Sequence, residues 1–177
     1  MFLALGEGGL VLIGLFAAWL ARVSVPFRVN LEALGVSLVA AVGFAALNLT
    51  LYRLGRRLGR PAGVFTFLEG EVFPLFRALS GREVVVLVCL AGLGEELFFR
   101  GVLQPVLGLG VASLIFGLFH GPTRELWPLA LWATVMGALL GLLYRLSDNL
   151  FVPVVAHALY DGVALAYVRS LPPVRTS

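Results

Sequence analysis

The chain contains no lysine, and only 13% of its 177 residues carry a formal charge. Soluble domains carry about 25% charged and about 45–50% apolar residues. This chain instead has 60% hydrophobic residues and a mean hydropathy of +0.99. The scarcity of charge excludes an ordinary soluble domain and indicates a polytopic membrane protein. With one composition throughout and no long linker, we expect a single domain over residues 1–177.

Other absences narrow the function. The lone Cys89 excludes a disulfide framework, and we expect it to fill space in the core. Neither this cysteine nor any serine has a base at a telling spacing, so no covalent nucleophile is expected. No basic stripe with interleaved aromatic residues is present, which argues against nucleic acid as a partner. No glycine-rich phosphate loop follows a strand.

Apolar runs with few or no charges predict the membrane spans, because about 20 apolar residues cross a bilayer as a helix. A cleaved signal peptide competes for the first run, but the basic segment that such peptides carry is missing. We therefore expect an all-α, polytopic transmembrane helix bundle of about six spans. The six runs are 8–21, 33–52, 83–103, 101–123, 126–144 and 149–168.

The stretch 61–80 differs from the spans. It combines four phenylalanines with Glu69, Glu71, Pro74 and Arg77, which makes it too charged and too broken to cross. Its aromatic residues suit a helix or re-entrant segment at the membrane interface. A plain packed connection is the alternative.

Arginine placement sets the expected orientation of this multi-pass protein. A cluster of arginines lies at 53–60, directly after the second predicted span, and cytoplasmic loops are enriched in arginine. With this cluster in the cytoplasm, most of the arginines fall on that side. Both termini are then expected in the cytoplasm.

Three acidic or basic residues interrupt the third predicted span. Glu95 and Glu96 are adjacent in an apolar stretch, and Arg100 follows Glu96 by four residues, which places the last two on one helix face. A carboxylate in hydrocarbon is costly unless it is paired, protonated or faces a polar cavity. This cluster is therefore the first candidate for chemistry.

The only two histidines also lie in apolar helical surroundings. His120 ends the run 113–120, and His157 precedes Asp161 by four residues, so this second pair shares a helix face. Ionisable groups inside a membrane usually face the bundle interior and pair with one another. We expect all six side chains to converge on one cavity.

Such a cavity has the groups needed for hydrolysis. A buried glutamate can serve as a general base toward water, and a histidine can donate to an oxyanion. Alternatively, two histidines and a carboxylate form a metal site with an open position for water. A non-catalytic membrane scaffold and a small proton-coupled transporter stay open as other classes. The absence of an inverted internal repeat weighs against the transporter.

Three segments carry a family resemblance. Residues 95–100 (EELFFR), 116–120 (FGLFH) and 157–161 (HALYD) resemble, in order, the EExxxR, FxxxH and HxxxN/D motifs of the CPBP family. This family includes the CAAX prenyl endopeptidases and the bacterial Abi proteins linked to bacteriocin processing and self-immunity. The resemblance places the motif-bearing core at about 82–168. It implies an intramembrane endopeptidase, or alternatively a self-immunity protein.

The resemblance also implies roles for the motif residues. Glu95 would activate water with help from His120, while Glu96 and Arg100 would form a pair that shapes the site. The family is commonly labelled metalloprotease, although a metal-free glutamate mechanism has also been argued for it. Membrane lipid and a membrane-associated peptide or protein would be the partners. The sequence does not show whether the substrate is prenylated.

The last motif leaves two roles open. His157 and Asp161 would either stabilise the oxyanion or complete a metal site with His120, for which zinc suits imidazole and carboxylate ligands. An ionised aspartate cannot donate a hydrogen bond. Asp161 would therefore act in its protonated form, orient His157, or bind the metal directly.

Overall fold

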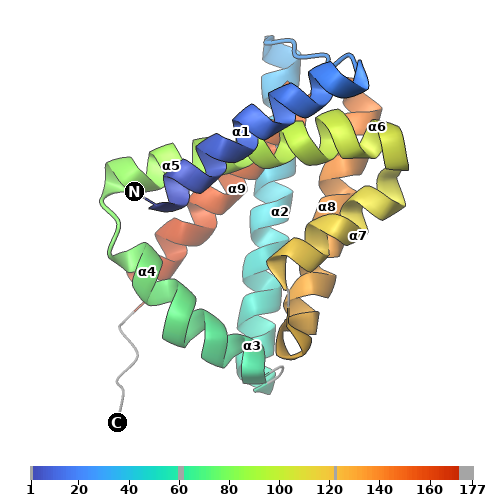
Figure 1. Ribbon diagram of the computed structural model, residues 1–177. Helices are drawn as coiled ribbons and strands as arrows, with labels where there is room; N and C mark the ends of the chain where they lie inside the picture. Colours follow the sequence, from blue (N-terminus) through green and yellow to red (C-terminus); the bar gives the residue numbers. More distant parts are fainter. Residues whose placement is uncertain (1, 60–61, 122, 172–177) are drawn as a thin grey trace.

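The computed structural model describes residues 2–59, 62–121 and 123–171, and every regular element in these ranges is helical (Figure 1). This confirms the all-α class. In chain order the elements are α1 (Phe2–Ala21), α2 (Leu31–Leu58), α3 (Ala62–Phe67), π-helix η1 (Leu68–Val72), α4 (Phe73–Arg77), α5 (Gly81–Glu96), π-helix η2 (Leu97–Leu103), α6 (Gln104–Leu107), α7 (Leu109–His120), 3₁₀-helix η3 (Arg124–Leu126), α8 (Trp127–Ser147) and α9 (Phe151–Ser170).

Three helical stretches are long and apolar enough to cross a membrane: Leu31–Leu58, Arg124–Ser147 and Phe151–Ser170. They overlap the second, fifth and sixth predicted spans. Two shorter apolar helices, Leu5–Ala21 and Leu109–His120, overlap the first and fourth predicted spans. The third prediction falls on α5 and η2, which follow one another without a break. The count of about six spans stays a prediction.

The longest helix, α2, shows how the sequence sets an element's ends. The Asn30 side chain accepts a hydrogen bond from the backbone N–H of Ala33 at 2.8 Å, which caps the first turn. Gly59 ends the helix in a left-handed conformation with φ 63°, which glycine adopts at little cost. Between these caps, small residues spaced four apart face α9, and small residues let helices approach closely in lipid. The buried ones are Ala33, Ser37, Ala41 and Ala45.

The helices α1 and α5 pack against each other and cross the long helices in the view of Figure 1. Gly94 permits their close approach, because a Cβ there would lie 2.9 Å from the carbonyl oxygen of Glu7. The helix α5 begins with a capping box in which Ser80 and Glu83 exchange side-chain and backbone hydrogen bonds. It also packs on α9. The segment that carries the two adjacent glutamates is thus held between α1 and α9.

The connection 62–77 consists of α3, η1 and α4, which run one into the next along one edge of the molecule (Figure 1). Phe73 is buried, and the ring of Tyr52 lies 5.9 Å from it and 5.6 Å from that of Phe65. These contacts seat the connection against the C-terminal end of α2. Its predicted position at the membrane interface stays a prediction.

The prediction that Cys89 fills the core is wrong, because this residue is exposed on α5. Val85 and Val86 are exposed nearby. The run 84–94 is apolar on all sides, so its sequence gave no amphipathic pattern to separate a buried face from an outward one.

Candidate active site

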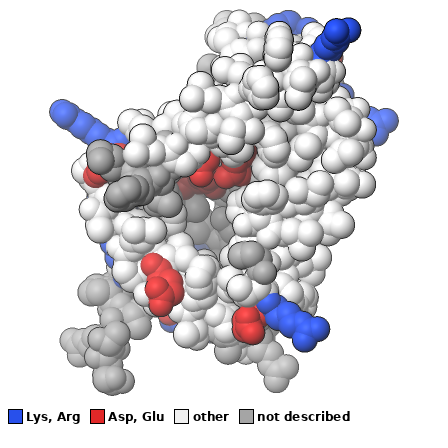
Figure 2. All heavy atoms as spheres, in the orientation of Figure 1, with Lys and Arg blue, Asp and Glu red and all other residues white. Residues whose placement is uncertain are grey.

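One face of the molecule is hollowed between α1 and α5, the α3–α4 connection, and α7 (Figure 2). Acidic side chains gather at the edge of this hollow beneath α1 and α5 (Figure 2). The six predicted site residues come from α5, η2, α7 and α9. The structure arranges five of them as two groups, one buried and one partly exposed, and the sixth, Asp161, lies partly exposed beside the buried group.

Glu96 is the centre of the buried group. Its side chain has no exposed surface, and its Oε1 lies 3.0 Å from Nη1 of Arg100 and 2.7 Å from Nδ1 of His157. The pair with Arg100 is the one that the four-residue spacing predicts. The contact with His157 joins α5 to α9 across 61 positions of sequence. Glu96 therefore fixes two of the motifs against each other.

Arg100 extends this group to α8. Its Nη2 donates to the carbonyl oxygen of Gly137 at 3.0 Å, and its Cζ lies 4.4 Å from the ring centroid of Phe116. One turn later, Nε2 of Gln104 donates to the carbonyl oxygen of Gly141 at 2.9 Å. These two hydrogen bonds form a short side-chain ladder between η2–α6 and α8. The π-helical turns of η2 carry the arginine, and such turns are frequent at functional sites.

His157 lies between two carboxylates. Its Nδ1 faces Glu96, and its Nε2 lies 3.4 Å from Oδ2 of Asp161. Ionised carboxylates only accept hydrogen bonds, so an imidazole that donates from both nitrogens satisfies both neighbours. The ring stacks on Tyr160 with centroids 5.2 Å apart and planes 6° apart. These contacts hold the ring in one orientation.

Glu95 and His120 form the second group. Oε2 of Glu95 lies 3.7 Å from Nε2 of His120, and their side chains are 14% and 37% exposed, against 0% and 3% for Glu96 and His157. The Nδ1 of His120 lies 2.8 Å from the carbonyl oxygen of Phe116, which can only accept. Nδ1 is therefore the donor, and in the neutral ring Nε2 presents a lone pair toward Glu95.

Glu7 of α1 is a site residue that the sequence reasoning missed. Its backbone lies against Gly94 of α5, the residue before Glu95, and its Oε2 is buried without a hydrogen-bond partner. It directly precedes the first apolar run, 8–21, and was not singled out from the sequence. The rule that a charge in an apolar helix marks function, applied to Glu95 and Glu96, would also have found it.

The predicted metal ligands do not form a metal site as they stand. Both ring nitrogens of His157 face carboxylates, and Nε2 of His120 faces Glu95. Across residues 2–59, 62–121 and 123–171, no three His, Cys, Asp or Glu side chains are grouped to hold a metal ion. Zinc bound by His120, His157 and Asp161 stays a prediction.

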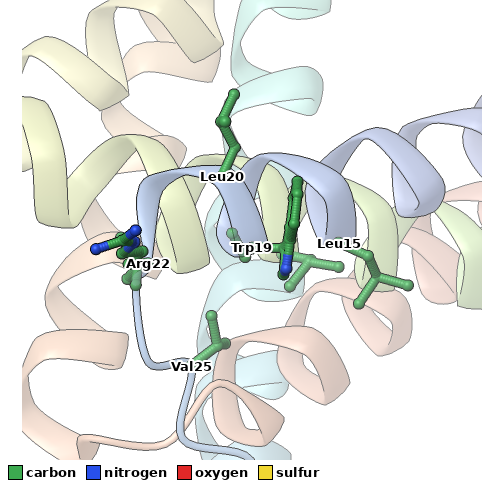
Figure 3. A pocket seen from close by; sticks show the side chains of 8 residues that line it. Leu15, Trp19, Leu20, Arg22 and Val25 are labelled. Atoms are coloured by element: carbon green, nitrogen blue, oxygen red, sulfur yellow. The ribbon is translucent and has the colours of Figure 1, made fainter.

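A separate cavity of about 640 Å³ lies at the C-terminal end of α1. Figure 3 shows Leu15, Trp19 and Leu20 on α1, with Arg22 and Val25 on the chain that follows it. Leu97, the first residue of η2, also contributes to its wall. None of the six predicted site residues lines this cavity, so it is distinct from the two groups above.

Comparison with known proteins adds the family. The family model described as Type II CAAX prenyl endopeptidase Rce1-like matches residues 77–163, which include all six predicted site residues. The protein YpbD of Bacillus subtilis (strain 168), described as uncharacterized, is 40% identical over 95 residues. That alignment covers 54% of this chain and 50% of YpbD, so it spans about half the length of this relative. No solved structure matches the chain. The family model thus bears out, over residues 77–163, the resemblance carried by the three motifs.

Proposed function

We propose that this protein is an intramembrane endopeptidase that hydrolyses a peptide bond of a membrane-associated peptide or protein. The match to the Rce1-like family model supports a CAAX-type protease. The observation that carries the proposal is the pair Glu95 and His120, which lies 3.7 Å apart beside the buried Glu96–Arg100–His157 group.

The chemistry of this pair favours water as the nucleophile. An ionised Glu95 and the Nε2 lone pair of His120 are both acceptors, and 3.7 Å is too long for a direct hydrogen bond between them. Two acceptors at this distance are satisfied by one water molecule that donates to each. A water held in this way has both protons engaged and a lone pair free for attack.

The proposed reaction then uses the carboxylate as base and acid. Glu95 accepts a proton as the water oxygen attacks the carbonyl carbon, and a tetrahedral intermediate with one negative oxygen forms. The C–N bond breaks, and the leaving nitrogen takes the proton from Glu95. His157 is the candidate donor to the negative oxygen, because Glu96 fixes its ring and Nε2 faces the partly exposed Asp161.

The buried group formed by Glu96, Arg100 and His157 supports the proposed role of His157 as the donor to the oxyanion. Arg100 balances the charge of Glu96, and Glu96 accepts from Nδ1 of His157, so Nε2 is left as the nitrogen that faces Asp161. Asp161 then orients the imidazole or shares the oxyanion in its protonated form. The division into a working pair and a supporting group is part of the proposal.

The membrane arrangement is proposed with the function. We place the protein as a multi-pass integral membrane protein of about six spans with both termini in the cytoplasm. The connection 61–80 lies at the interface in this arrangement. The exposed arginines at the C-terminal end of α2 support the cytoplasmic placement of that end. Membrane lipid is then an obligatory surrounding of the site.

The test is peptide cleavage by purified protein in liposomes. A prenylated CAAX peptide, the same peptide without the prenyl group, and a bacteriocin leader peptide serve as probes. Glu95→Gln and His120→Ala are expected to reduce cleavage by at least about 100-fold, the usual contribution of a general base. Glu32→Gln, an exposed glutamate of α2, is the matched control and is expected to retain full activity.

Unchanged turnover in folded Glu95→Gln would refute the proposal. Proton flux in the same liposomes separates a transporter from a protease. Flux without cleavage of any of the three peptides would favour the transporter, and neither activity would favour a scaffold or self-immunity protein.

A further inference from the structure

A second cavity, of about 270 Å³, lies between the C-terminal end of α2, the η1–α4 connection and the end of α9. Figure 1 shows α4 beside the C-terminal part of α9. The charged side chains that line the cavity are Arg53, Arg56, Arg57, Arg77 and Glu69. None of them belongs to the three motifs, and the proposed hydrolysis does not use them.

Contacts around the cavity hold these side chains in place. Nη1 of Arg56 lies 2.9 Å from Oε1 and 3.0 Å from Oε2 of Glu69, and the Tyr52 hydroxyl donates to the same carboxylate at 3.2 Å. The guanidinium of Arg53 lies 5.2 Å from the ring centroid of Tyr167, within range of a cation–π contact. The guanidinium groups of Arg53 and Arg56 are thus held at the wall of the cavity.

The charged side chains of this lining are mostly cationic. Arg56 is paired with Glu69, and Arg53 and Arg57 add two further guanidinium groups. Arg77 donates from Nε to the carbonyl oxygen of Val168 at 3.3 Å. A concave wall of several guanidinium groups matches the planar, bidentate hydrogen bonding that phosphate oxygens accept.

Two simpler explanations account for part of the cluster. Arg56 and Arg57 lie in the last turn of α2, where cations stabilise a helix end, and arginines near a span set its orientation. Neither effect requires Arg77, which comes from α4, to meet the α2 arginines in one cavity. These two effects therefore do not account for the meeting of arginines from α2 and α4 in one cavity.

We propose that this cavity binds a phosphate group, either the headgroup of an anionic phospholipid or a free phosphate ester. The cavity lies at the end of α2, a candidate span, and in the membrane arrangement proposed above this end meets the lipid headgroups. Bound phosphate bridges α2 to α4 and thereby holds the 62–77 connection against the bundle.

The test measures lipid binding by the full chain in detergent micelles. Phosphatidylglycerol, phosphatidylcholine and inorganic phosphate are titrated, and the thermal unfolding midpoint and native mass spectrometry report binding. Phosphatidylglycerol is expected to bind at least about tenfold more tightly than phosphatidylcholine, because hydrogen bonds to a charged group are each worth about tenfold or more. Arg57→Gln and the double variant Arg53→Gln/Arg57→Gln are expected to lose this preference stepwise.

Arg82→Gln is the matched control, because Arg82 is exposed and does not line the cavity. It is expected to bind like the unaltered chain. If the double variant does not fold, Arg57→Gln alone decides. If millimolar phosphate displaces the lipid, a free phosphate group is enough to fill the cavity. If phosphate does not displace the lipid, the ligand is the phospholipid headgroup. Equal weakening by Arg82→Gln, or no lipid preference in the unaltered chain, overturns the proposal.

Discussion

Removal of the Arg100 guanidinium tests whether the buried group holds the active site together. Arg100→Met keeps an unbranched apolar side chain but leaves Glu96, which has no exposed surface, with His157 as its remaining partner. The carbonyl oxygen of Gly137 loses the donor that lies 3.0 Å away, and the ring of Phe116 loses the overlying cation.

The expected cost follows from these losses. Breaking a buried ion pair by removing one partner costs about 3–5 kcal/mol, and the contact of Glu96 with His157 places this case near about 3 kcal/mol. By the scaling known for soluble chains of similar length, this lowers the thermal unfolding midpoint by roughly 6–12 °C. Circular dichroism during heating in detergent micelles measures this shift.

The double variant Glu96→Gln/Arg100→Met tests whether the loss of stability comes from the unpaired charge of Glu96. It removes the uncompensated charge, and the glutamine amide oxygen can still accept from Nδ1 of His157. We expect the double variant to be more stable than the sum of the two single effects by about 0.5–3 kcal/mol, the range for directly coupled residues. A midpoint for Arg100→Met within about 2 °C of the unaltered chain, or strictly additive single effects, would refute the reasoning.

Three further predictions concern other parts of the molecule. Glu7→Gln is expected to reduce cleavage by up to about tenfold without loss of helicity, because a neighbouring negative charge strengthens a carboxylate base such as Glu95; an unchanged kcat would remove Glu7 from the site. Gly117→Ala is expected to destabilise the protein by about 1–3 kcal/mol, because its Cβ would overlap Thr134, whereas Gly110→Ala in the same helix has nothing within 4 Å and is expected to be neutral in the same thermal scan. Treatment with a zinc chelator is expected to leave cleavage within about twofold, since in the proposed reaction the pair Glu95 and His120 acts on water directly; loss of cleavage that zinc alone restores would instead support the zinc site.

The convergence of the polar residues could be predicted from the sequence. The six motif residues are ionisable groups in apolar runs, and the cost of leaving such groups unpaired in lipid requires them to meet. Contacts four residues apart followed from helix geometry, as with Glu96 and Arg100, or His157 and Asp161. These contacts depend only on a local repeat, which the sequence displays directly.

Contacts between helices could not be predicted in the same way. The sequence pointed to Asp161 as the neighbour of His157, yet the shorter contact is with Glu96, from another helix. Which of two adjacent glutamates faces α9 depends on the rotation of α5, and a run that is apolar on all sides does not fix that rotation. The same ambiguity explains why Cys89 was wrongly placed in the core, and no residue pattern signals the π-helical turns of η2.

The side-chain ladder from Arg100 and Gln104 to α8 also sets how η2 and α6 lie along α8. Its acceptors are the carbonyl oxygens of Gly137 and Gly141, and a Cβ at Gly141 would lie 2.4 Å from the amide oxygen of Gln104. A slip of one helical turn, about 5.4 Å, would present Gln104 with Arg145 in place of a glycine. Two glycines outside every motif thus fix the position of η2 and α6 along α8.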